Sequence, residues 1–186
     1  VTSDDQIWTD DEITELVGSY VRAAQLAAGV GADFVDLKHC HGYLLHEFLS
    51  AHTRPGRYGG SFENRARFWI ETMAAVKRAV GDRVAVGTRI AIDNLLGPFG
   101  LELEEGLRFV ELMSGEGVCD LWNIKISYFM EWGNDAGPSR FFKSGYQTWA
   151  TKAVKEVTNV PVVGVNRMTS PDDMVKIIVT GEADLI

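Results

Sequence analysis

Stretches with a helical period alternate along this chain with short, almost wholly apolar runs. Apolar residues between Thr9 and Ala28 recur every three or four positions, which predicts an amphipathic helix with Thr9 or Asp10 as its N-cap. The same period predicts further helices at about 62–80, 104–114, 147–157 and 171–180. The apolar runs predict strands at 33–39, 84–92, 120–126 and 161–165, and the start of a fifth strand at 183–186.

Unbroken alternation of helices and apolar strands predicts a parallel sheet covered by helices, an α/β fold. No strand is followed by Gly-x-Gly-x-x-Gly, so a dinucleotide-binding Rossmann fold is disfavoured. Polar residues stand instead at or just after several strand ends, as they do in a (β/α)8 TIM barrel. A full barrel has eight strands, so we expect a partial barrel, with residues 1–186 as a single domain from its middle and later part.

Composition narrows the classes of partner. The 186 residues are 46% hydrophobic and 24% charged, as in ordinary globular proteins, and carry a net charge of −8. A negative charge argues against nucleic acid as a partner, and no apolar run is long enough to cross a membrane. No signal peptide is recognisable, and two cysteines far apart indicate a reducing compartment, so we expect a cytoplasmic location. No metal-binding motif is present.

The densest candidate chemistry follows the first strand, where Lys38, His41 and Tyr43 fall within six residues. Strict strand alternation would point Lys38 and His41 to opposite faces unless the chain turns after the strand. Arg89 lies in an otherwise apolar strand and therefore needs a buried partner or a ligand. Lys125 ends the third strand and is a candidate for a substrate pocket.

Three further features of the sequence allow either a functional or a structural interpretation. Trp122 either lines a substrate pocket or belongs to the core, and Trp density alone does not decide between them. His46, within the apolar segment 44–49, is interpreted as structural. The polar residues of 63–67 are interpreted as a helix start tied to neighbouring loops.

Two long motifs resemble the Old Yellow Enzyme family of FMN-dependent oxidoreductases. The first is His41-Gly42-Tyr43-Leu44, and the second is Tyr58-Gly59-Gly60-Ser61-Phe62-Glu63-Asn64-Arg65. The resemblance continues through 86–89 and 161–167 and so covers nearly the whole chain. Residues 131–141 are similar to the trimethylamine dehydrogenase branch, and the pair Asn166-Arg167 to the 2,4-dienoyl-CoA reductase branch.

The resemblance implies FMN at the carboxyl-end face of a barrel of which this chain covers roughly strands 4 to 8. It implies that Tyr43 donates a proton and that His41 and Lys38 bind the substrate. It also implies that Arg89 contacts the pyrimidine side of the flavin. Lys38 departs from the family pattern, which has His or Tyr there, and its charge favours an anionic oxygen over a cationic amine.

The loop after the fourth strand is implied to hold the FMN phosphate, through Gly164, Asn166 and Arg167. The resemblance also makes a 4Fe–4S cluster and NAD(P)H expectations, both through parts outside this chain. The substrate is expected to be a small molecule. Whether the protein forms a homo-oligomer stays open.

Several functions remain open at this point. Lys38 leans toward an enoate or dienoyl reductase, and residues 131–141 lean toward an amine dehydrogenase or demethylase. A flavin-independent phosphate-binding barrel, such as an aldolase or isomerase, would also use the glycine and arginine after the fourth strand. A further alternative is an inactive fragment, which would bind FMN poorly.

Overall fold

The structure, a computed structural model, describes residues 7–126, 140–165 and 167–186. Helices and strands alternate as the sequence predicts, with bounds that agree within one or two residues. The elements are α1 (Asp10–Gly29), β1 (Phe34–His39), α2 (Leu44–Leu49), α3 (Phe62–Val80), β2 (Ala85–Ala91), α4 (Leu103–Gly115), β3 (Leu121–Lys125), α5 (Thr148–Lys155), β4 (Val162–Gly164) and α6 (Pro171–Val179). The short helix α2 was not predicted, because six residues are too few to show a helical period.

Side-chain caps explain where three of the helices begin. The Thr9 hydroxyl accepts the backbone N–H of Glu12 at 3.2 Å, and the Glu12 carboxylate accepts the backbone N–H of Thr9 at 2.7 Å. This reciprocal pair is a capping box, so the predicted cap at Thr9 is confirmed. Ser61 and Ser170 each accept a backbone N–H at the start of α3 and α6. Such caps stabilise a helix by about 1 kcal/mol each.

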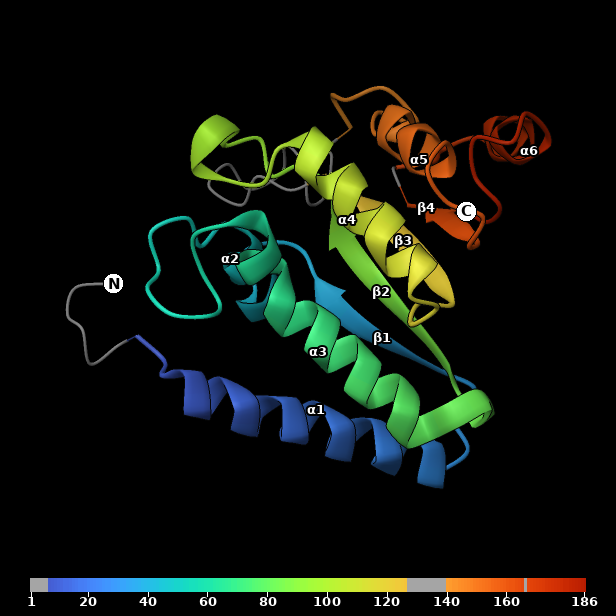
Figure 1. Ribbon diagram of the computed structural model, residues 1–186. Coiled ribbons are helices and arrows are strands. Elements are labelled where there is room, and N and C mark those ends of the chain that lie inside the picture. The colour runs from blue at the N-terminus through green and yellow to red at the C-terminus, as the bar shows by residue number, and fades with distance from the viewer. Residues whose placement is uncertain (1–6, 127–139, 166) are drawn as a thin grey trace.

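The four strands form one parallel sheet in the order β1-β2-β3-β4 (Figure 1). Neighbours in sequence are therefore neighbours in the sheet, as in a barrel, whereas a doubly wound sheet reverses its order at a switch point. The fold is a partial (β/α)8 barrel, as predicted. The predicted start of a fifth strand is a single bridge between Val163 and Leu185 in the described residues.

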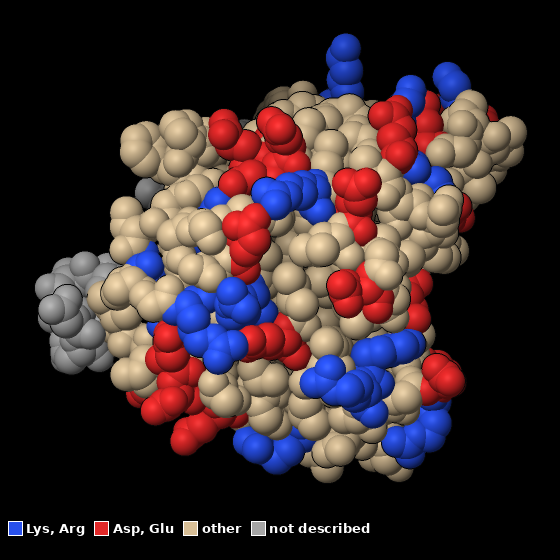
Figure 2. All heavy atoms as spheres, viewed as in Figure 1, with Lys and Arg blue, Asp and Glu red and all other residues tan. Residues whose placement is uncertain are grey.

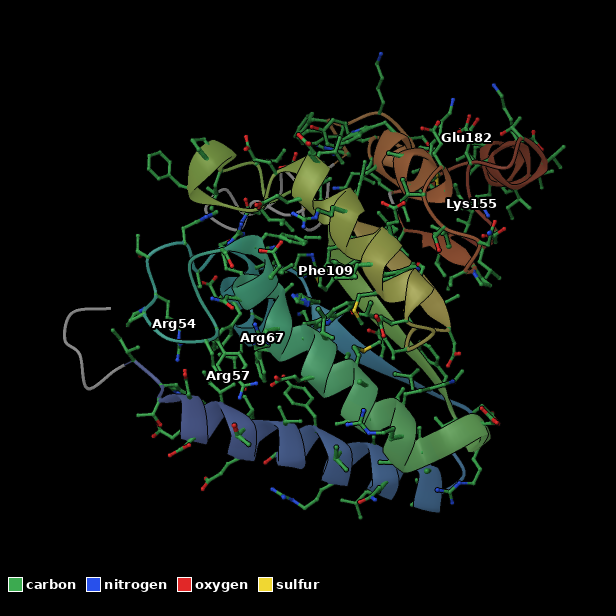
Figure 3. All side chains as sticks on the ribbon, viewed as in Figure 1. Arg54, Arg57, Arg67, Phe109, Lys155 and Glu182 are labelled. Atoms are coloured by element: carbon green, nitrogen blue, oxygen red, sulfur yellow. The ribbon has the colours of Figure 1, made fainter. Side chains whose placement is uncertain are left out.

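One face of the sheet is buried under helices. The His39 ring lies 5.0 Å from the Trp69 ring of α3 and 5.9 Å from the Phe109 ring of α4. Trp122 of β3 lies 5.8 Å from the same Trp69 ring. Figure 3 shows Phe109 between α4 and the strands behind it. Because side chains alternate along a strand, Lys38 lies on the opposite face, the inner face of the barrel.

The loop between α2 and α3 is tied down by two arginines. The buried guanidinium of Arg65 donates to the Gly60 carbonyl at 3.0 Å and pairs with the Glu105 carboxylate. Arg54 pairs with Asp10 at 3.0 Å, beside the start of α1 (Figure 3). Arg65 of the second motif thus serves as scaffold, in agreement with the interpretation of residues 63–67 as a helix start tied to neighbouring loops. On the helical side of the molecule, positive and negative side chains are interspersed (Figure 2).

Candidate functional site

Cationic side chains meet on the inner face of the sheet, near the carboxyl ends of the strands. Lys38 of β1 is directly opposite Arg89 of β2, and Arg89 is directly opposite Asn123 of β3. Lys125 lies two residues beyond Asn123, on the same face, and is only 4% exposed. The tertiary structure therefore brings together residues from positions 38, 89 and 125 of the chain, as the barrel prediction required.

A tight turn after β1 brings Tyr43 back toward Lys38. The strand ends at His39, and both His41 (φ 60°) and Gly42 (φ 64°) have left-handed backbone conformations. This reversal places the Lys38 ammonium 3.6 Å from the centroid of the Tyr43 ring, a cation–π contact. The sequence left open whether the chain turns here. It does, and Lys38 and Tyr43 meet as a result.

The turn is held from inside the core by His46. The Nδ1 atom of His46, which is buried in α2, accepts the backbone N–H of Gly42 at 3.0 Å. Because Nδ1 accepts, a neutral His46 carries its proton on Nε2. The interpretation of His46 as structural agrees with this contact.

The imidazole of His41 stays neutral at ordinary pH. Burial, together with the positive charges of Lys125, Lys38 and Arg89, lowers the pKa of His41 to about 4. Its Nδ1 atom lies 3.4 Å from the Cys40 sulfur. Cys40 is fully buried, and burial raises the pKa of its thiol to about 11, which disfavours the reactive thiolate.

Two buried polar atoms at the centre of this face have no hydrogen-bond partner in the described part of the chain. They are Nε of Arg89 and Oδ1 of Asn123. The backbone N–H of Arg89, by contrast, donates to Asp36 at 2.8 Å. Buried polar groups are nearly always paired, so a polar ligand is the natural partner of both atoms. Asn123 was missed in the sequence, although an amide between two apolar strand residues was an available signal.

Trp122 does not reach this face. Its side chain is 0% exposed, it packs under the helices, and its indole N–H donates to Ser114 at 3.2 Å. The expectation that Trp122 lines a pocket is therefore corrected: it is a core residue. The physical reason is alternation, because Trp122 is adjacent in sequence to Asn123, which faces inward.

The loop after β4 offers less to a phosphate than the sequence suggested. The backbone N–H of Gly164 donates to the Leu185 carbonyl at 2.9 Å and is thus already used. Arg167 has φ 48° and donates one N–H to the Phe142 carbonyl at 3.3 Å, which leaves other guanidinium donors available. Asn166 lies outside the described residues, as do residues 131–139 of the amine-dehydrogenase-like segment.

Two hollows in the surface are possible ligand sites. The larger, about 770 Å³, is lined by Asp120, Thr158 and Pro161 at the amino ends of β3 and β4, away from the cations. A groove of about 470 Å³ beside β1 is lined in part by Lys38 and Tyr43. Ligands of barrels bind at the carboxyl ends of strands, so the inner face at Lys38 is the candidate site.

No group of three or more His, Cys, Asp and Glu side chains within the described ranges could hold a metal ion. Among those same residues, no helix is long and apolar enough to cross a membrane.

A family model described as the NADH:flavin oxidoreductase / NADH oxidase family matches residues 2–186. The dimethylamine dehydrogenase of Hyphomicrobium sp. (strain x) is 45% identical over 179 residues, which are 95% of this chain and 24% of that enzyme. The NADH oxidase of Thermoanaerobacter brockii is 34% identical over 96% of this chain and 27% of that enzyme. The chain thus spans about a quarter of the length of these relatives.

The chain is also similar in structure to solved proteins of this kind. A 6-hydroxypseudooxynicotine amine oxidase from Pseudomonas geniculata N1 is 40% identical, with a TM-score of 0.87 over 100% of this chain and 28% of that one. The histamine dehydrogenase of Rhizobium sp. 4-9 is 35% identical, with a TM-score of 0.85 over 96% of this chain and 26% of that one. An old yellow enzyme homologue from Zymomonas mobilis, 23% identical over 96% of this chain and 48% of that one, shares the fold with a TM-score of 0.74.

Proposed function

Because this chain belongs to the NADH:flavin oxidoreductase / NADH oxidase family, we propose that it is part of an FMN-dependent oxidoreductase acting on a small organic molecule. The observation that carries the proposal is the buried Nε of Arg89, which has no hydrogen-bond partner among the described residues and lies where the carboxyl ends of three strands meet. We take residues 1–186 as one contiguous part of the flavin-binding barrel, and we expect a cytoplasmic protein.

The inner face suits a flavin. Reduced flavin carries negative charge on its pyrimidine side, and a fixed guanidinium next to it stabilises that charge. Arg89 supplies the guanidinium, and Asn123 supplies an amide beside it. Arg167 is proposed to pair with the phosphate through its remaining donors, together with Asn166. Gly164 contributes close packing and not an N–H, since that group is bonded to the neighbouring segment.

FMN, when bound, accepts or donates a hydride at its N5 atom. The residues of this chain then bind and orient the substrate. Tyr43 is 59% exposed at the mouth of the site, so its phenol is accessible to a substrate. His41, neutral because of burial and nearby cations, can accept or donate a hydrogen bond without adding charge. Lys38 adds a fixed positive charge next to the phenol.

Oxidation of an amine is the reaction that we favour. A hydride leaves the carbon next to the nitrogen, the nitrogen lone pair forms a C=N bond, and water converts the resulting iminium to an aldehyde and a smaller amine. Support comes from the likeness to the dimethylamine dehydrogenase and to two solved amine-oxidising enzymes. Reduction of an activated alkene is the second candidate. It is favoured by the exposed Tyr43 phenol, which can supply the proton that such a reduction consumes.

The first test is an absorption spectrum of the full-length protein, recorded without oxygen before and after adding dimethylamine, an N-methyl amino acid, or NADH. Yellow flavin bands that bleach with an amine support the favoured reaction, and bleaching with NADH followed by recolouring with an enoate supports the second. A colourless protein contradicts the proposal and favours the alternative function, a flavin-independent aldolase or isomerase barrel. The same spectrum reports a 4Fe–4S cluster, if the full-length protein holds one.

A pair of variants then tests the residue that carries the proposal. Arg89→Met removes the guanidinium and is expected to lower FMN affinity about tenfold or more, since hydrogen bonds to charged groups contribute about 1.5–3 kcal/mol. Arg89→Lys keeps the charge and is expected to lose less. Equal FMN affinity in all three proteins would show that Arg89 does not contact the flavin.

A further inference from the structure

Among the described residues, positive charge exceeds negative charge on the inner face of the sheet. Lys38, Arg89 and Lys125 lie on this face, on three successive strands, and Asp36 is the acid that accompanies them. The charges act on the same small volume, because all three cations lower the pKa of His41. By contrast, the helical side of the molecule mixes both signs (Figure 2).

Two of these cations, Lys38 and Arg89, form no ion pair among the described residues. Asp36 is engaged by the backbone N–H of Arg89. The negative charge of a flavin bound at Arg89 would pair with the guanidinium of Arg89. The ammonium of Lys38 would then be available to pair with a different anion.

Lys38 is held in position to bind such an anion. Its ammonium is fixed over the Tyr43 ring at 3.6 Å, while the turn that carries Tyr43 is locked by the His46 contact. A cation–π contact leaves the N–H donors on the far side of the ammonium available to a ligand. Lys38 and Tyr43 lie together at the carboxyl end of β1, the end at which ligands of barrels bind.

We propose that the substrate carries a carboxylate, which Lys38 binds, so that the amine oxidised by this enzyme is an N-alkylated amino acid and not a simple alkylamine. This inference rests on the proposed function. A bare alkylammonium would be repelled by the ammonium of Lys38 at short range. A carboxylate on the same molecule reverses the sign of that interaction and fixes the substrate by one end.

Two probes that differ by a carboxylate test the substrate class. Sarcosine is dimethylamine in which one methyl hydrogen is replaced by a carboxylate. The rate of flavin bleaching without oxygen, measured in the full-length protein, is expected to be at least tenfold higher at equal concentration with sarcosine. Lys38→Met should remove most of this preference, and Lys38→Arg should retain it. A preference for dimethylamine that is equal in wild type and Lys38→Met would overturn the inference.

A binding measurement separates this inference from the proposed function, because it needs no turnover. Propanoate and its neutral amide are titrated against the flavin absorbance of each protein. Propanoate is expected to bind about tenfold or more weakly to Lys38→Met than to wild type, while propanamide binds alike to both. Lys152→Met, which removes an exposed lysine from α5, is the matched control and should change neither. Flavin that is bound but insensitive to propanoate would refute the carboxylate site alone, whereas a protein without flavin would refute the proposed function as well.

Discussion

The Nδ1 atom of His46 accepts the backbone N–H of Gly42 at 3.0 Å, so a buried helix directly supports the turn that carries His41 and Tyr43. The left-handed backbone of His41, a residue with a Cβ, makes this turn costly unless its surroundings hold it, whereas Gly42 adopts that conformation freely. The contact joins the apolar core to the inner face of the barrel. It also gives a structural role to the histidine that stands among the leucines of α2.

Replacement of His46 by Leu is expected to destabilise the protein by about 1–3 kcal/mol, because the N–H of Gly42 loses its acceptor inside the structure. His46→Asn places an amide oxygen near the position of Nδ1 and should recover part of the loss. The thermal unfolding midpoints of the full-length protein and both variants check this. Equal midpoints for Leu and Asn would show that the acceptor contributes nothing.

Stability should decrease as the pH falls from 6.5 toward 4. Burial lowers the pKa of His41 and His46 to about 4, and burial followed by the charge of His46 lowers the pKa of His39 well below 6.5. Above pH 6.5 these histidines are neutral in both states and contribute no pH dependence. Below it, the unfolded chain binds protons that the folded chain excludes, so unfolding is favoured.

The measurement is the thermal unfolding midpoint at intervals from pH 7.5 to 4.5. His46→Asn removes one titrating group and should flatten the dependence relative to wild type, which separates the histidines from carboxylates that titrate at the acidic end. A wild-type midpoint that stays constant over this range would contradict the prediction.

Trp122→Ala is expected to cost about 3–5 kcal/mol of stability, as is usual for a fully buried large aromatic side chain. The flavin spectrum and FMN affinity of the folded variant should equal those of wild type, because Trp122 lies on the helical side of the sheet. Chemical unfolding and FMN titration are measured on the same preparation. A changed flavin spectrum at low temperature, where the variant is folded, would show that Trp122 contributes to the flavin or substrate pocket.

Gly106→Ala should destabilise the protein, since an added Cβ would lie 2.0 Å from the backbone carbonyl oxygen of Ile92. Helix α4 would have to move away from the end of β2, at a cost of about 1–3 kcal/mol. Gly115→Ala on the same helix is the control, because nothing lies within 4 Å of its added Cβ. The control is expected to be neutral or slightly stabilising. Equal unfolding midpoints for the two variants would show that α4 tolerates the shift.

The order and bounds of the helices and strands followed from the sequence because they depend on local period and caps. Phe62–Val80 is a helix with the predicted ends, since Ser61 caps its start and Gly81 follows its last residue. The motifs around Tyr43 and Arg65 likewise identified the family, which the match over residues 2–186 confirms.

Facing direction and hydrogen-bond partners were decided only by the tertiary structure. Trp122 and Asn123 are neighbours in sequence, yet one is a core residue and the other faces the inner side, because the register of β3 against β2 sets which position points inward. The sequence suggested that Gly164 helps to bind a phosphate, but in the folded chain its backbone N–H donates to the carbonyl of Leu185. Lys38 meets Tyr43 only because the chain reverses after His39. Such contacts join residues that local pattern does not relate, so they exist only once the sheet has assembled.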